Sequence, residues 1–540
     1  MAVTAVIVAA SVIYLLHLGR RTTFFYDEWS WLTQRRGWRP SAFLASHNGH
    51  FVALPVLIYH LLFTTVGARH YLPYRLALMA FHAGTCLCLY FYARRRVDPW
   101  LAAVAAGAMC LIGAAYQDLV WPFQMTLMGA LCLGMAAWLV LDHEPSRRTD
   151  VLALVLLLGA ISCSGAGLAM LAGAAVLVAC RRQWRRWWLI AVPGLAFLLW
   201  YVRYGGDPVQ PSSTGHKLRY LADGFRSGVA ALTGHPYNRA VGLAATLSVI
   251  IALLAVARLL WSLLSERRPP AGLLGAATAA LALWGLTAVG RGHFNDYGSS
   301  RYMYGAALVV VLLVLECLRG LPAQRLLAAG LAVLTAFAVN TGLGTLRPGT
   351  KSLANVDTYV RADLAAVEQL RNPVLGYRIN SRFVPTLTVG QYLSVRRDLG
   401  SPAMPFAAVP GQPAGVRNDV DRVLRDAGQL MLDPASRPGT HPVTLTADPV
   451  LTLPRLRGCV IVRGTLLTVE LRLPTGGLVI TALEDPATVW VHRFGPTGIR
   501  WGSIAAGDSA RLSATADDSA TPWSVQVRSP GAVELCADGR

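Results

Sequence analysis

Long apolar runs alternate with short polar turns over residues 1–343. About 20 consecutive apolar residues in a helix cross a bilayer core, and on this criterion the pattern predicts eleven spans. The predicted spans are 2–18, 73–93, 99–115, 122–141, 150–162, 166–180, 187–204, 241–263, 271–289, 302–318 and 324–342. We therefore expect an α-helical, polytopic membrane bundle over residues 1–343.

From residue 344 the pattern becomes that of a soluble domain. Residues 356–370 have helical spacing, and from about Val443 short β-rich runs are separated by Gly, Pro and Asp. These runs are 459–462, 465–471, 478–483, 488–491 and 523–527. We expect a second domain over 344–540, with a mixed α/β segment at 344–440 and a β-sandwich-like part at 441–540.

Arginines in the short turns orient the predicted spans. The clusters are Arg94–Arg96, Arg147–Arg148, Arg181–Arg186, Arg267–Arg268, and Arg319 with Arg325. Eleven spans place all of them on one face, which the positive-inside rule makes cytoplasmic. The C-terminal domain and the loops around 19–72, 115–121, 205–240 and 290–301 are then extracytoplasmic. The net charge of +20 is explained by this rule, and no nucleic-acid partner is expected.

Two stretches leave the topology open. Residues 149–180 are long for one span, and we expect two short helices meeting at an irregular segment, 162–167, since a single span would reverse the side of Arg181. Residues 51–67 could form a twelfth span with the N-terminus outside. We favour an interfacial helix there, because Pro55 and His60 interrupt the run.

Composition agrees with a membrane protein, because 54% of the residues are apolar and only 14% are charged. Lys217 and Lys351 are the only lysines, an arginine bias typical of a GC-rich bacterial genome. Seven of the nine cysteines lie in apolar runs and are interpreted as small hydrophobic residues. Cys459 and Cys536 lie in the exported domain, where a disulfide is expected, with two buried thiols as the alternative.

The predicted outer loops contain one adjacent acidic pair, Asp27 and Glu28, just after the first span. A carboxylate at the membrane surface can act as a general base. Alternatively, Asp27 caps a short interfacial helix and Glu28 is solvated. His47 and His50 follow in the same loop and can bind a hydroxyl or phosphate or lie at the interface; their spacing without a third ligand does not favour zinc.

Two arginines are expected on the outer face, where the positive-inside rule disfavours them. Arg291 and Arg301 flank a short loop, and a guanidinium group matches a phosphate through its planar fork. Alternatively, both side chains snorkel to the interface. Tyr302, Trp121 and Gln124 are further candidates, although an aromatic belt also explains the tyrosine and the tryptophan.

The layout of these residues resembles the GT-C superfamily of glycosyltransferases, which use polyprenyl-phosphate sugars. The similarity is carried by the acidic pair after the first span, the histidine-containing loop, and Pro73-Tyr74-Arg75 opening the second span. The segments 116–124 and 300–304 are also similar. The resemblance covers roughly residues 1–340 and rests on layout more than on a long motif.

The resemblance implies transfer of a sugar from a polyprenyl-phosphate donor to an extracytoplasmic glycan or lipid acceptor of an actinobacterial-type cell envelope. A lipid phosphate leaves without protonation, so a single base is sufficient, and Asp27 is implied in that role with Glu28 beside it. Glu28 and Asp118 would orient the acceptor or hold a divalent metal such as Mg²⁺ or Mn²⁺, a question left open. The implied donor-phosphate ligands are Arg291, Arg301 and Tyr302, and the implied substrate ligands are His47, His50, Asp118, Trp121 and Gln124.

Other functions remain open. A lipid-linked sugar transporter or flippase would also use arginines for phosphate, but it predicts inverted repeats and midplane charges, neither of which is evident. A non-catalytic envelope scaffold that binds glycan is the third alternative. The β-rich domain would either bind the acceptor glycan or cap and stabilise the bundle.

Overall fold

The structure is a computed structural model. It describes residues 1–540 except 206–212, 267–268, 292–295, 322–323, 436–440, 442, 444, 446–451, 454–458, 464–466, 518 and 539–540. The chain forms two compact units. The first contains Met1–Thr22 and Gln34–Ala354, and the second contains Thr23–Thr33 and Asn355–Arg540.

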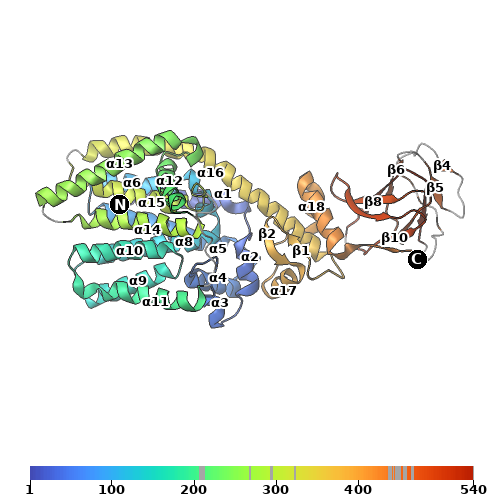
Figure 1. The fold of residues 1–540 in the computed structure, drawn as a ribbon, viewed down its shortest axis with the longest axis horizontal. Helices are drawn as coiled ribbons and strands as arrows, with labels where there is room; N and C mark the ends of the chain where they lie inside the picture. The colour runs from blue at the N-terminus through green and yellow to red at the C-terminus, as the bar shows by residue number, and fades with distance from the viewer. Residues whose placement is uncertain are drawn as a thin grey trace. The chain divides into compact units, whose positions relative to one another are not determined.

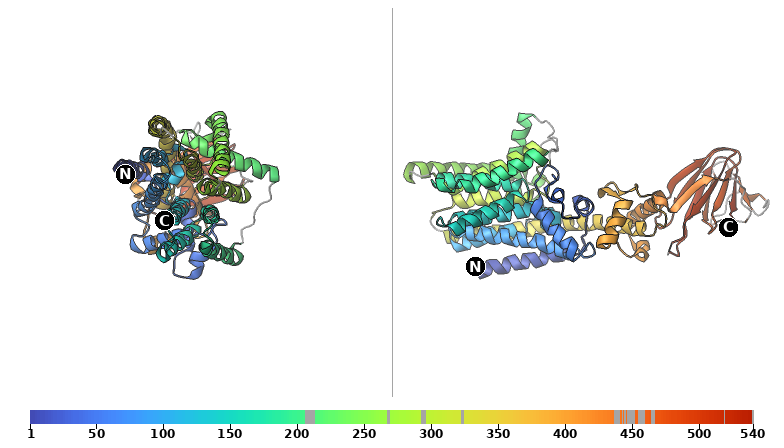
Figure 2. Two further views of the ribbon diagram at one scale, coloured as in Figure 1. Left: turned by 90° about the vertical axis from the view of Figure 1, so that its left-hand side faces the viewer. Right: turned by 90° about the horizontal axis from the view of Figure 1, so that it is seen from below.

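The first unit is a bundle of helices that run roughly side by side (Figures 1 and 2). Its helices are α1 (Ala2–Leu18), α3 (Pro40–Leu44), α4 (Ala53–Thr65), α5 (Leu72–Ala93), α6 (Pro99–Cys110), α7 (Tyr116–Val120), α8 (Met125–Leu141), α9 (Arg147–Ile161), α10 (Ala166–Cys180), α11 (Trp188–Tyr204), α12 (Thr214–Leu232), α13 (Val241–Trp261), α14 (Ala271–Arg291) and α15 (Met303–Cys317). A long helix, α16 (Gln324–Glu368), begins in this unit and ends in the second.

Seven helices of the described chain are long and apolar enough to cross a membrane, or eight if the bent pair Pro99–Cys110 and Gly113–Val120 is one span. The chain is therefore a multi-pass membrane protein. Helices α10 and α15 are apolar but have only 15 residues each, and eleven spans remain a prediction. Helix α4 has 13 residues, or about 20 Å, which is short for a bilayer core and favours the interfacial interpretation of 51–67.

The stretch 149–180 forms two helices, as expected. Helix α9 ends at Ile161 and α10 begins at Ala166. The Arg186 side chain, just after α10, pairs with Asp150 in the first turn of α9, with a Nε–Oδ1 distance of 2.9 Å. The two helices are therefore antiparallel, and the arginines that flank them lie at the same end of the unit.

Ion pairs hold three of the five arginine clusters at this end, here named the arginine end, and Arg147–Arg148 lie there too because they share the first turn of α9 with the paired Asp150. The pairs are Arg96–Asp142 (2.9 Å), Arg181–Asp142 (2.5 Å), Arg96–Glu316 (2.5 Å), Arg186–Asp150 (2.9 Å), Arg319–Glu316 (3.9 Å) and Arg325–Asp98 (3.6 Å). The fifth cluster, Arg267–Arg268, lies outside the described residues. These clusters share one end of the bundle, as the positive-inside rule requires of its cytoplasmic face.

The second unit contains most of α2 (Asp27–Gln34), the end of α16 and a C-terminal part with helices and three sheets, the smallest formed by β1 and β2. After α16 come β1 (Arg378–Asn380), β2 (Val384–Thr388), α17 (Val389–Leu399), α18 (Ala414–Leu424) and β3 (Leu430–Pro434), and then β4 (Thr452–Leu453), β5 (Val460–Val462), β6 (Leu467–Arg472), β7 (Leu478–Ala482), β8 (Ala487–His492), β9 (Ile499–Ile504), β10 (Ser509–Ala514), β11 (Ser524–Ser529) and β12 (Val533–Ala537). A mixed segment followed by a β-sheet domain is the order expected from the sequence.

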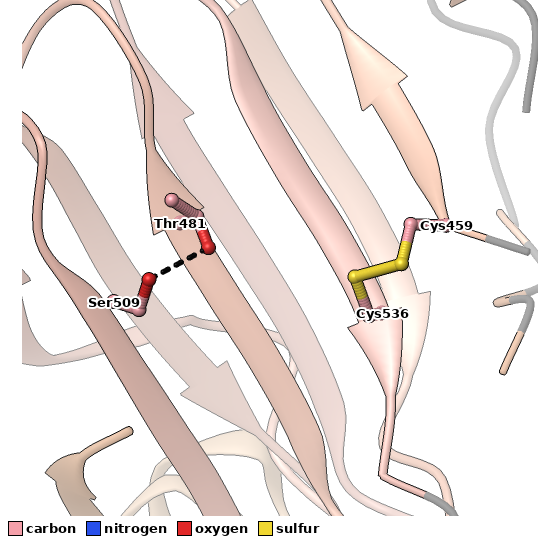
Figure 3. The surroundings of a disulfide bond; sticks show 4 residues. All are labelled: Cys459, Thr481, Ser509 and Cys536. Carbon is pink, nitrogen blue, oxygen red and sulfur yellow. Dashed lines mark hydrogen bonds between the residues drawn. A yellow bond between two sulfur atoms is a disulfide. The ribbon is translucent and has the colours of Figure 1, made fainter. Parts of the chain in front are cut away.

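The β domain has a six-stranded sheet, ordered β3-β10-β7-β12-β5-β4, and a four-stranded sheet, ordered β6-β11-β8-β9. Strand β8 alternates buried and half-buried residues, so each sheet turns one apolar face inward. Cys459 and Cys536 are joined by a disulfide bond in the six-stranded sheet. Figure 3 shows it beside the hydroxyl contact of 2.9 Å between Thr481 on β7 and Ser509 on β10.

Candidate functional site

The segment that carries the acidic pair is held inside the second unit. The Tyr26 N–H donates to the Phe383 carbonyl at 2.9 Å. The Trp29 side chain is fully buried; its Nε1 donates to the Phe24 carbonyl at 2.9 Å and its ring packs edge-on against Tyr392. The position of Asp27 is thus set by residues from the far end of the sequence.

The two carboxylates of this pair have different surroundings. Glu28 is fully buried, and its Oε2 accepts a hydrogen bond from the Phe25 N–H at 3.2 Å. The alternative interpretation, in which Glu28 is solvated, is wrong, because the Glu28 carboxylate is buried and bonded to this backbone donor at the start of α2. Asp27 is only partly buried, so it is the carboxylate of the pair that a substrate can reach.

In the first unit, His47 and His50 form the two ends of a tight turn. Their backbones exchange two hydrogen bonds of 3.1 and 3.0 Å, and Asn48 and Gly49 between them have positive φ angles of 51° and 79°. An Asn-Gly pair favours this geometry, since glycine takes a positive φ without strain. The Asn48-Gly49 pair therefore sets the backbone positions from which the two histidine side chains extend.

This turn joins several other predicted residues. The His47 ring lies 5.4 Å from the Phe123 ring, which stacks on Trp121 at 5.0 Å. The His50 ring lies against Gly165, in the break between α9 and α10, where an added Cβ would come within 3.3 Å of His50 Nδ1. Gln124 is buried beside this group, at the start of α8.

Asp118 is fully buried on α7. Its Oδ2 accepts a hydrogen bond from the Tyr304 N–H at 3.1 Å, while its Oδ1 has no hydrogen-bond partner among the described residues. Arg301 is near enough to act on it electrostatically. A buried carboxylate oxygen without a donor is rare in folded proteins and indicates a site for a ligand, a water molecule or an ion.

Arg301 and Tyr302 meet an acid that the sequence interpretation had not selected. Asp296 accepts hydrogen bonds from Arg301 Nη2 at 2.7 Å, the Tyr302 hydroxyl at 3.4 Å and the Tyr220 hydroxyl at 2.9 Å. Burial and the neighbouring Asp296 charge raise the pKa of Tyr220, keeping its hydroxyl a donor. The Arg291 side chain lies outside the described residues.

An apolar groove of about 590 Å³ opens beside the histidine turn. Its lining consists of Leu44, Phe51, Leu158, Gly159, Ile161, Ser162, Ala196, Leu199, Trp200, Arg203 and Tyr204. Trp200 closes one wall, because its Nε1 donates to the Leu44 carbonyl at 2.7 Å and its ring stacks on Phe51. Arg203 is the charged residue of this lining.

These features share the end of the first unit opposite the arginine end, here named the distal end and comprising residues 44–51, 118–124, 158–165, 196–204 and 301–304. Helix α15 shows this directly, because Tyr304 at its start meets Asp118 and Glu316 near its finish pairs with Arg96. The distal end gathers His47, His50, Asp118, Trp121, Gln124, Arg301 and Tyr302. Asp27 and Glu28 belong to the second unit.

Few residues are arranged to hold a metal ion. In the described chain, the one group of three potential ligands is Cys459, Glu534 and Cys536, and the disulfide consumes both of its thiols. Asp118 Oδ1 is a single available oxygen, whereas Mg²⁺ requires near-octahedral coordination, part of which water and substrate can supply. Metal dependence therefore stays open.

No protein-family model matches the chain, and no curated protein matches it. A solved structure with a similar outline is the crystal structure of ArnT from Cupriavidus metallidurans bound to undecaprenyl phosphate. The likeness has a TM-score of 0.46 at 17% sequence identity and covers 79% of this chain and 92% of that chain. A likeness this remote does not assign the chain to a family.

Two residues at or next to the distal end, Arg203 and Asp296, were missed in the sequence, although a signal for each was present. Arg203 ends a predicted span on the expected outer face, so the argument made for Arg291 and Arg301 applied to it equally. Asp296 lies five residues before Arg301, within the loop that those arginines flank. Searching every outer-face charge would have found both.

Proposed function

We propose that the protein is an integral membrane glycosyltransferase. It transfers a sugar from a polyprenyl-phosphate donor to an extracytoplasmic acceptor glycan or lipid of the cell envelope. The observation that carries this proposal is the apolar groove opening beside buried polar groups at the distal end. The donor has a hydrocarbon chain and a polar phosphosugar. Its site therefore needs an apolar surface next to a polar one.

The groove takes part of the isoprenoid chain, because its lining is apolar apart from Arg203, Ser162 and the Tyr204 hydroxyl. The donor phosphate is bound by distal-end arginines. Arg301 with Tyr302 is one candidate and Arg203 is another. Arg291 is a third candidate on sequence grounds alone. Guanidinium groups suit this task, since they remain charged and bind phosphate in a bidentate manner. Asp296 positions Arg301 by accepting a hydrogen bond from its Nη2 at 2.7 Å.

Asp27 is the proposed general base. It accepts the proton of the acceptor hydroxyl as that oxygen attacks the anomeric carbon of the sugar. The bond from the anomeric carbon to the phosphate oxygen breaks, and its electron pair leaves with the lipid phosphate, which needs no proton. Glu28 holds the start of α2 through the Phe25 N–H, and Asp118 Oδ1 accepts a hydrogen bond from a substrate hydroxyl.

The catalytic test uses purified protein in nanodiscs with a panel of polyprenyl-phosphate sugars. We expect Asp27→Asn to lower kcat by about 10²–10⁴-fold with the thermal stability unchanged, since Asn has the same shape but cannot take the proton. Glu144→Gln, an exposed acid at the arginine end, is the matched control. Equal turnover by Asp27→Asn and wild type would show that Asp27 is not the general base. Movement of the donor across vesicles without transfer would identify a flippase instead.

Topology is tested separately. Asp27→Cys in intact cells should react with a membrane-impermeant maleimide added from outside. Labelling from the cytoplasmic side alone would support twelve spans and remove Asp27 as an extracytoplasmic base.

The β domain is proposed to bind the acceptor glycan through the outward face of its four-stranded sheet. On that face three side chains lie in a row on neighbouring strands. Gln526 on β11 is opposite Trp490 on β8 on one side and Glu470 on β6 on the other. Arg528 lies over the Trp490 ring at 4.6 Å. An aromatic ring among hydrogen-bonding side chains suits a sugar chain. We expect Trp490→Ala to raise KM for a polymeric acceptor and not for a short one; equal KM values would leave the domain a stabilising cap.

A further inference from the structure

The turn between α10 and α11 carries an unusual concentration of arginine and tryptophan at the arginine end. Its sequence is Arg181-Arg-Gln-Trp-Arg-Arg-Trp-Trp188. Two of these arginines are structural. Arg181 pairs with Asp142 at 2.5 Å, and Arg186, only 1% exposed, pairs with Asp150 at 2.9 Å and also donates to Gln183. Asp142 and Asp150 are therefore already paired with these two structural arginines.

The remaining charged and aromatic side chains of the turn face outward. Arg182 and Arg185 are exposed and have no acidic partner among the described residues. Trp184, Trp187 and Trp188 are 60%, 37% and 40% exposed, and the Trp184 and Trp187 rings lie nearly parallel, with centroids 6.2 Å apart. Exposed tryptophans in such numbers need a partial apolar environment.

The start of α9 adds to the same surface. Arg147 and Arg148 are exposed, and the Arg186–Asp150 pair holds this end of α9 against the turn. Glu144 is the exposed acid nearby in sequence. Four exposed arginines against one acid leave a clear positive excess. The positive surface formed by residues 147, 148, 182, 184, 185, 187 and 188 is here named the Arg-Trp patch.

We infer that the Arg-Trp patch is a binding site for the headgroup of an anionic phospholipid. Arg182 and Arg185 bind the phosphate, Arg147 and Arg148 add to the attraction, and the tryptophans lie at the boundary between headgroup and acyl chains. The ion pairs of Arg181 and Arg186 already hold the turn in place without a lipid. Binding therefore loses little conformational entropy from ordering the turn. The inference does not depend on the proposed transferase activity.

The test measures binding of phosphatidylglycerol and phosphatidylcholine to the full chain in detergent, by native mass spectrometry. We expect wild type to prefer phosphatidylglycerol, and Arg182→Gln with Arg185→Gln to weaken that binding about 25-fold, or about fivefold per arginine. Phosphatidylcholine binding should not change. The control is Arg371→Gln with Arg397→Gln, which removes the same charge from exposed positions of the second unit.

Two further measurements separate recognition from misfolding. The Arg182→Lys and Arg185→Lys variant keeps the charge and should retain most of the binding. Bromine-labelled phosphatidylglycerol should quench tryptophan fluorescence less in Trp184→Phe than in wild type. Equal binding of the two lipids by wild type, or undiminished phosphatidylglycerol binding by the double Gln variant, would overturn the inference.

Discussion

The two ends of the helical unit both bury charged groups, but they satisfy them differently. At the arginine end, Asp142, Asp150 and Glu316 each accept from at least one arginine. At the distal end, Asp118 keeps an oxygen without a hydrogen bond among the described residues. Breaking a buried pair is costly, whereas an unsatisfied buried group is tolerated mainly where function needs it. Hydrogen bonding therefore distinguishes the buried acids of the two ends more clearly than burial does.

The largest effect is expected from breaking the arginine end. Arg96→Gln removes the buried guanidinium that Asp142 and Glu316 share, leaving Asp142 with Arg181 and Glu316 with Arg319. It should lower the free energy of unfolding by about 3–5 kcal/mol. Thermal unfolding in detergent measures this change. Activity per folded molecule should stay the same. Arg94→Gln, at an exposed position two residues away, should change stability by less than about 0.5 kcal/mol. Equal shifts for both variants would show that the network is not what stabilises this end.

A smaller effect is expected from removing the charge of Asp118 at the distal end. Asp118→Asn keeps an acceptor for the Tyr304 N–H but removes the charge, so it should lower kcat/KM by about 10–100-fold, the worth of one hydrogen bond to a charged group. Stability should hardly change. Asp142→Asn is the counterpart at the arginine end. It should lower the free energy of unfolding and leave kcat/KM almost unchanged. If Asp118→Asn unfolds the protein yet leaves turnover intact, Asp118 is structural too.

The smallest effect concerns the groove. Ala196→Phe narrows it from the α11 wall, so we expect the KM for the lipid donor to rise about fivefold, with kcat maintained. Ala191→Phe adds the same ring to an exposed position of α11 outside the groove and should leave KM unchanged. Steady-state kinetics with donors of increasing chain length would check this. A KM insensitive to Ala196→Phe would place the isoprenoid chain elsewhere.

Much of the fold was predictable, because membrane helices are long and uniformly apolar. The observed α5, α8 and α10 lie within a few residues of the predicted spans. The β domain was predicted in part. Five apolar runs correspond to β5, β6, β7, β8 and β11. The strands β3, β4, β9, β10 and β12 were missed. In β10 the reason is clear, because Ser509–Ala514 contains mainly small or polar residues. Pairing with neighbouring strands overrides such weak local preference.

The candidate site was predictable in residue type but not in arrangement. Local patterns identified the Asn-Gly turn and the acidic pair. They could not show that Trp29 packs on Tyr392, because nothing local marks a contact across so much sequence. They also could not distinguish Asp27 from Glu28, since only the fold decides which carboxylate the Phe25 N–H meets.

The discontinuous second unit imposes an order on biogenesis. Residues 23–33 are synthesised early, yet the rest of their unit begins at Asn355. A ribosome adding about 5–20 residues per second needs on the order of half a minute to cover that interval. During this time Trp29 lacks its later contact with Tyr392. Asp27 takes its final place only after the residues from Asn355 onward have emerged, so the proposed general base is assembled late in synthesis.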